Sequence, residues 1–157
     1  MLFSPIRINK VKLENRIVMP ALVTGLATED GLVTDKLKER YRRQAKGGVG
    51  CIFTEAAVVL PSKSPYNLRI SDDKFVPGLK SLVNLVHSEG NSRIAIQLCH
   101  FLKIARSGWR QKVEDLTPED IKVIIKQHVD AAERAKSAGF DMIEIHMAHA
   151  YTLASFL

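Results

Sequence analysis

Several features that narrow a protein's function are scarce in this sequence. Its 157 residues include only two cysteines, Cys51 and Cys99, without metal-ligand spacing, so we expect free thiols and neither a disulfide nor a zinc site. No run approaches the ~20 apolar residues of a membrane-spanning helix. The first five residues lack the basic start and apolar core of a signal peptide. These absences predict a cytoplasmic protein with no membrane partner.

Acidic residues are also in the minority. Lys and Arg number 23 against 17 Asp and Glu, which gives a formal net charge of +6. Such an excess can indicate nucleic-acid binding. Much of it falls in the expected helix 35–46, however, where Leu37, Tyr41 and Ala45 form an apolar stripe and basic residues occupy other positions. A solvated helix face explains this pattern better, so we expect no nucleic-acid partner.

What the sequence does contain is a regular alternation of apolar strands and amphipathic helices. Its 46% hydrophobic residues are enough for one packed domain. Two short extended pieces around the turn-prone Asn9-Lys10 predict a hairpin. The order that follows predicts an α/β fold with a parallel sheet and right-handed crossovers. The expected strands are 15–20, 49–54, 93–98 and 142–146, and the expected helices are 35–46, one that follows 71–73 and closes at Gly90, and one that runs from Thr117 to Gly139.

Periodicity also predicts which side chains are buried. In the last strand, Ile143 and Ile145 should face covering helices, while Met142, Glu144 and His146 face the other way. The strands at 17–19 and 142–146 should be the two edges of the sheet. The last helix should bury a stripe made of Ile121, Ile124, Ile125, Val129 and Ala132.

Polar side chains gather just after the last strand, at His146, His149 and Tyr151. Ligands bind at the carboxyl ends of parallel strands, because the following loops converge there. Two imidazoles and a phenol could donate three hydrogen bonds to one electron-rich centre. The residues alone leave two other interpretations open: polar groups that satisfy the local backbone, or a zinc site. Zinc would require a third ligand, and no carboxylate or third histidine lies nearby in the sequence.

Seven motifs, in this order, resemble the Old Yellow Enzyme family of NADH:flavin oxidoreductases, and the similarity covers essentially the whole chain. Any one of them would be weakly specific, but together they are highly specific. They are the segments 2–6, 13–20, 27–35, 45–50 and 54–56, the Gln97-Leu-x-His100 motif, and 138–151.

This resemblance implies a TIM-barrel-type (β/α)₈ fold that binds FMN, which takes hydride from NAD(P)H and passes it to an enone-like or other small-molecule acceptor. No metal is implied. His146 and His149 match the pair that hydrogen-bonds the acceptor carbonyl oxygen, and Tyr151 matches the tyrosine that protonates the α-carbon. The residues that match those against the isoalloxazine ring are Pro20, Ala21, Leu22, Ala56 and Gln97.

The chain departs from the family pattern in two motifs and in length. Leu102-Lys103 replaces a Gly-Arg pair, and Ala150 replaces a glycine. Residues 1–157 correspond to about four of eight strands, so we expect one domain, the N-terminal half of a barrel, with FMN bound weakly or not at all by this chain alone. The inner face, including Met142, would then be uncovered, and a homodimer or a second chain would complete the barrel. The alternative is a catalytically inactive half-barrel that serves as a structural or interaction module without flavin.

Overall fold

Two β-sheets organise the chain, whose residues 1–61, 64–102 and 111–157 are described by a computed structural model. A hairpin pairs Ile6 with Leu13 in antiparallel register and turns at Asn9, which has a φ of 50°. Asparagine tolerates this left-handed conformation better than most residues. The second sheet is parallel, in the order β3-β4-β5-β6, as the sequence predicted. The strands are β1 (Ile6–Ile8), β2 (Val11–Leu13), β3 (Val18–Met19), β4 (Cys51–Val58), β5 (Arg93–Cys99) and β6 (Met142–Ile145).

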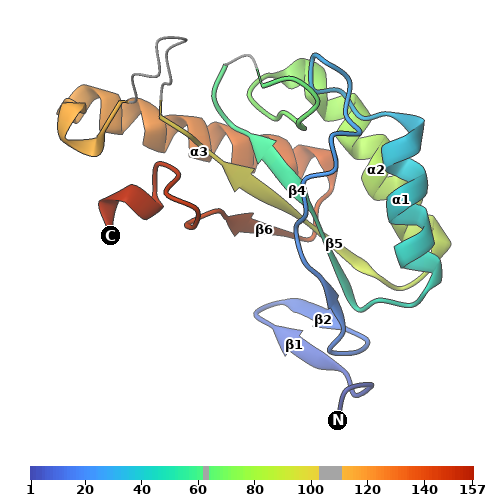
Figure 1. The fold of residues 1–157 in the computed structure, drawn as a ribbon. Helices are drawn as coiled ribbons and strands as arrows, with labels where there is room; N and C mark the ends of the chain where they lie inside the picture. The colour runs from blue at the N-terminus through green and yellow to red at the C-terminus, as the bar shows by residue number, and fades with distance from the viewer. Residues whose placement is uncertain (62–63, 103–110) are drawn as a thin grey trace.

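Three long helices connect the parallel strands and lie on one side of their sheet (Figure 1). They are α1 (Asp35–Lys46), α2 (Val76–Glu89) and α3 (Pro118–Ala138), with 3₁₀ turns at Asp73–Phe75, Val113–Asp115 and Ala154–Phe156. Side chains cap the starts of two helices: the Thr34 hydroxyl accepts from the Leu37 N–H, and the Thr117 hydroxyl accepts from the Asp120 N–H. None of the helices in the described residues is long and apolar enough to cross a membrane.

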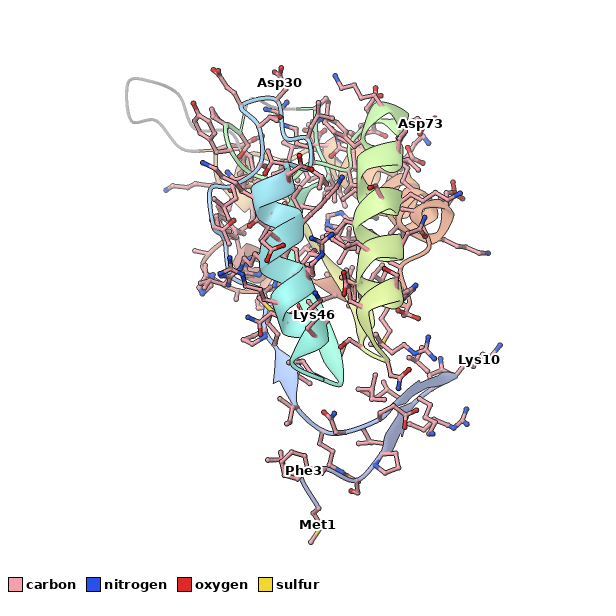
Figure 2. The ribbon with its side chains drawn as sticks, turned by 90° about the vertical axis from the view of Figure 1, so that its right-hand side faces the viewer. Met1, Phe3, Lys10, Asp30, Lys46 and Asp73 are labelled. Carbon is pink, nitrogen blue, oxygen red and sulfur yellow. The ribbon has the colours of Figure 1, made fainter. Side chains whose placement is uncertain are left out.

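The main core lies between these helices and the outer face of the sheet. Leu37, Tyr41 and Ala45 of α1 are buried, which confirms the predicted stripe. Of the basic residues around it, Lys36, Arg43 and Lys46 are exposed, whereas Lys38, Arg40 and Arg42 are half-buried. Figure 2 shows α1 and α2 side by side, with Lys46 at the end of α1 nearer the hairpin and Asp73 just before α2, at the end of the helix pair away from the hairpin. Helix α2 also buries an apolar stripe, which consists of Leu79, Leu82, Val83 and Val86.

The hairpin covers the inner face of the sheet near the N-terminal ends of its strands. Leu13 is 1% exposed and packs in a small cluster with Cys51 and Ala95, and Met142 packs against it. The expectation that Met142 is uncovered is therefore wrong, because the hairpin lies beyond the N-terminal ends of the strands and covers this layer (Figure 1).

Near the edges of the sheet, one strand is shorter than predicted and two other burial predictions are wrong. The strand expected at 15–20 contains only two residues, and Val18 is 44% exposed because β3 has only one neighbouring strand. Ile143 and Ile145 of β6 are 42% and 40% exposed. In the last helix, Ile124 is buried but Ile125 and Val129 are exposed. Since α3 packs on α2 and β5, no described helix covers β6 or the flank of α3 beside it.

An irregularity in β4 changes which of its side chains face inwards. Phe53 pairs with Ala95, whereas Ala56 pairs with Gln97, so three steps along β4 correspond to two along β5. Such a bulge reverses the alternation of faces beyond it. Ala56 therefore shares the inner face with Gln97 and Glu144, its successive partners across the sheet.

Candidate functional site

A cavity of about 330 Å³ lies at the carboxyl ends of the parallel strands. This is where ligand sites form in (β/α) folds, and the volume is at the lower end of the usual range of about 300–1,000 Å³. Seven of the eight site residues predicted from the sequence line it, and Pro20, which is exposed, does not. The lining residues are Ala21, Leu22, Val23, Ala56, Val58, Ser64, Asn67, Gln97, Cys99, Phe101, His146, His149 and Tyr151.

The two histidines and the tyrosine form one cluster on a wall of the cavity. The ring centroid of His146 lies 5.2 Å from that of His149 and 5.1 Å from that of Tyr151, and the other two rings are 6.3 Å apart, all edge to face. His146 is buried, whereas Tyr151 is 39% exposed. Burial, together with the nearby His149, lowers the pKa of His146, so its ring is neutral at pH 7 and has one donor and one acceptor nitrogen.

The backbone after β6 brings these rings together. The His146 N–H donates to the Leu98 carbonyl at 3.0 Å, which extends the pairing with β5 by one step. A tight turn follows, in which His149 and Ala150 have φ values of 58° and 53°. Left-handed residues other than glycine are uncommon, so this turn is strained at the residues that carry the predicted chemistry.

The opposite wall is formed by the loop after β3, which a buried carboxyl group fixes in place. Glu55 is fully buried, and one of its oxygens accepts from the Thr24 N–H at 3.1 Å and from the Thr24 hydroxyl at 2.5 Å. Burial raises the pKa of Glu55, while the bonds from Thr24 oppose that rise. Ala21 and Leu22, three and two residues before Thr24, are thereby positioned at the cavity.

The cavity residues fit the ring of a flavin. Ala56 offers only a methyl group, so a flat ring can approach the sheet closely, and Gln97 beside it has no side-chain hydrogen bond among the described residues. That half-buried amide is available to pair with a polar ring edge. Among the described lining residues there is no Lys or Arg, so they suit an uncharged ring better than a phosphate group.

The zinc interpretation finds no support in the described part of the chain, where no group of three or more His, Cys, Asp or Glu could hold a metal ion. Cys51 and Cys99 are buried free thiols, as predicted. Burial raises the pKa of both to about 11, so neither is a thiolate at pH 7.

Sequence reasoning missed several cavity residues. Phe101 has its ring centroid 6.4 Å from that of Tyr151, and Asn67 approaches from the loop after β4. No local pattern distinguishes these residues from other loop residues, and only the convergence of loops at the strand ends could have indicated them. The sequence departs from the family pattern at Leu102-Lys103, and Lys103 lies outside the described residues.

Comparison with known proteins finds the same architecture in flavin enzymes. A family model described as NADH:flavin oxidoreductase / NADH oxidase family matches residues 1–114 and 103–157. An NADH oxidase of Thermoanaerobacter brockii is 37% identical over 99% of this chain and 27% of its own length. An NADPH dehydrogenase of Listeria welshimeri is 38% identical over 99% of this chain and 51% of its own.

Among solved structures, Old Yellow Enzyme from Pichia sp. AKU4542 superposes with a TM-score of 0.83 and 28% identity, over 98% of this chain and 47% of that one. The described fold therefore corresponds to about half of a TIM barrel, as the sequence predicted. The chain spans about half the length, or less, of the curated relatives described above.

Proposed function

We propose that this chain, which belongs to the NADH:flavin oxidoreductase / NADH oxidase family, carries the acceptor-binding side of an FMN-dependent NAD(P)H oxidoreductase. The observation that carries the proposal is the single cavity in which His146, His149 and Tyr151 face the Ala56 and Gln97 floor. The acceptor we propose is an enone-like or other small molecule with an electron-poor double bond next to a carbonyl group.

In this proposal, FMN supplies hydride transfer from NAD(P)H to the β-carbon of the acceptor. Ala21, Leu22, Ala56 and Gln97 would hold its ring, with Pro20 next to them outside the cavity lining. His146 and His149 would donate hydrogen bonds to the acceptor carbonyl oxygen, where negative charge develops. Preorganised donors at such an oxygen typically lower a barrier by several kcal/mol. A neutral His146 retains one ring N–H with which to donate.

Tyr151 would complete the reaction as a general acid. Its phenol is 39% exposed, and its ring lies edge to face with His146 at a centroid distance of 5.1 Å. From there it would donate a proton to the α-carbon as the β-carbon receives hydride, which leaves a saturated carbonyl product. The histidines would thus orient the acceptor, and the tyrosine would complete the addition.

Residues 1–157 would form one domain, the N-terminal half of the barrel, completed by a second copy of the chain or by another chain. The unpaired edges at β3 and β6 support this assembly. Exposed apolar side chains on α3 and β6 support it further; they are Ile125, Val129, Ile143 and Ile145, which we together term the β6 flank. Joining two four-stranded halves edge to edge would produce a closed eight-stranded sheet and cover both flanks.

Light scattering of micromolar protein tests the assembly. We expect a particle of twice the 17.5 kDa chain mass, which Ile125→Lys converts to monomer because a charge in a buried interface is costly. Val123→Lys is the matched control, since Val123 is 56% exposed on the opposite side of α3. A folded monomer that doubles in mass only when the second half of a relative's barrel is added would instead identify a second chain. A folded monomer that binds neither would refute the proposed assembly.

The function is tested under anaerobic conditions with NADPH, a small cyclic enone and FMN. We expect little quenching of flavin fluorescence at micromolar concentrations, because the described lining lacks a phosphate site. FMN in large excess should then support enone reduction that depends on the chain and on Tyr151. A rate equal to that of the mixture without the chain, in an assembled and folded sample, would support the structural module instead.

A further inference from the structure

A buried polar junction lies directly behind the proposed catalytic residues. His100, which follows β5, is 7% exposed, and Thr152, which follows Tyr151, is fully buried. The Nδ1 atom of His100 lies 2.7 Å from the Thr152 hydroxyl, and the Thr152 N–H donates to the His100 carbonyl at 3.2 Å. The same two residues, 52 positions apart, are therefore joined through both side chain and backbone.

Helix α3 supports the junction from behind. The His100 ring lies against that of His128, with centroids 5.9 Å apart. His128 is itself fixed by a bond of 2.8 Å between Nδ1 and the Ile124 carbonyl. Burial and the neighbouring His128 lower the pKa of His100 to about 4, so at pH 7 the ring is neutral. A neutral imidazole has one donor and one acceptor nitrogen, so Nδ1 can pair with the Thr152 hydroxyl in either role.

The junction lies at the end of the strained turn described above. His149 and Ala150 are both left-handed, a conformation that is unfavourable for residues other than glycine. Such a conformation persists only when the surrounding contacts enforce it. Hydrogen bonds to β5 and to the residue just after it lie on both sides of the turn: His146 N–H to Leu98 before it, and Thr152 N–H to His100 after it. Residues 146–152 therefore form a short loop that the end of β5 and the residue following it fix at both ends.

We propose that His100 and Thr152 are a positioning pair that keeps His149 and Tyr151 facing the cavity. Their role rests on the proposed function, because it matters to turnover only if these two residues act on the acceptor. Neither His100 nor Thr152 lines the cavity, so neither touches the acceptor. The placement itself can be measured without flavin or substrate, which separates this proposal from the activity of the assembled enzyme.

The test uses Thr152→Val, which keeps the shape of the side chain and removes the hydroxyl group. The readout is the set of ring resonances of His149 and His146 in the flavin-free chain, together with the rate at which diethyl pyrocarbonate modifies His149. We expect the His149 signals to shift or broaden and its modification to accelerate several-fold. Thr152→Ser, which restores a hydroxyl group, should return both measurements towards those of the wild type.

Ser92→Ala is the matched control for loss of a buried hydroxyl group. Ser92 is 3% exposed and donates to the Val49 carbonyl, but it lies before β5, at the other end of the sheet. The Ser92→Ala substitution should lower the melting temperature about as much as Thr152→Val does, while leaving the His149 signals unchanged. The proposal is overturned if Thr152→Val leaves those signals as in the wild type, or if Ser92→Ala perturbs them equally. If the signals respond as expected but no variant or wild-type assembly reduces an acceptor, the positioning role stands and the proposed function fails.

Discussion

The two ends of the parallel sheet differ in how they are closed. At the hairpin end, Leu13 packs into the small cluster beneath the sheet. Nearby, Asp141 accepts hydrogen bonds from His87 at 2.8 Å, from Arg93 at 3.2 Å and from the Ile94 N–H at 2.9 Å. At the site end, a cavity remains open between loops, and its lining includes the buried ring of His146 and the exposed rings of His149 and Tyr151.

Backbone strain follows the same division. At the hairpin end, the left-handed residues are Asn9, Gly48 and Gly139, whose residue types tolerate that conformation. At the site end Gly25 and Gly31 are left-handed too, but so are Tyr66, His149 and Ala150, which do not tolerate it as well. The comparison teaches that stability and chemistry are spatially separated: a well-packed end offsets the cost of exposure and strain where the reaction would take place.

The largest effect on stability should come from the hairpin end. Leu13→Ala removes a side chain that is 1% exposed and should lower the free energy of unfolding by about 2–4 kcal/mol, as buried leucine truncations do. Leu22→Ala at the site end, where the side chain is 61% exposed, should change it by less than about 0.5 kcal/mol. Urea unfolding of both variants checks the contrast, and similar losses would mean that the two ends are not distinct.

The next largest effect on stability should come from acidification, and it should act at the site end. The pKa of His100 is about 4 in the folded state against 6.5 when unfolded. The unfolded chain therefore binds this proton first, and stability from the neutral ring is full above pH 6.5 and is lost as pH falls towards 4. The pKa difference corresponds to a loss on the order of 3 kcal/mol. Urea unfolding from pH 7 to 4 should show that slope in the wild type and a much smaller one in His100→Asn. Parallel slopes would contradict the assignment.

At Tyr151, an effect on catalysis should be separable from an effect on stability. In the active assembly, Tyr151→Phe should slow acceptor reduction by about 100-fold, or roughly 2.7 kcal/mol, and leave flavin reduction by NAD(P)H nearly unchanged, because only the second half-reaction needs the proton. His149→Ala should chiefly weaken acceptor binding. Stopped-flow measurement of each half-reaction distinguishes these effects. Equal losses in both half-reactions would mean that the residues serve folding.

The smallest effect concerns the strained turn. Ala150→Gly should raise the free energy of unfolding by no more than about 1 kcal/mol, because the relief of a left-handed alanine exceeds the added entropy of the unfolded chain only slightly. Gly48→Ala at the hairpin end, where φ is 76°, should do the opposite by a similar amount. Thermal unfolding of this pair tests whether strain is confined to the site end.

Much of this organisation could be predicted from local signals. The starts of α1 and α3 could be predicted from Thr34 and Thr117, because capping depends on residues within one turn. The rings of His146, His149 and Tyr151 could be placed together because six positions contain them all. The exposure of Ile125 and Val129 could not be predicted, since an apolar stripe does not reveal whether a neighbouring element covers it. The His100 and Thr152 pair was also missed, because only the fold brings these distant residues into contact.

The bulge in β4 has a consequence for how this sequence can change over evolutionary time. The extra residue between Phe53 and Ala56 directs the Glu55 carboxylate to Thr24, away from the cavity lining, and presents the methyl group of Ala56 to the cavity. If β4 paired regularly beyond Phe53, Glu55 rather than Ala56 would lie opposite Gln97, and an acid would face the position of the flat ring. The one extra residue therefore decides whether a methyl group or a carboxyl group faces the cavity, so selection at this point acts on the pairing register of β4 as well as on its side chains.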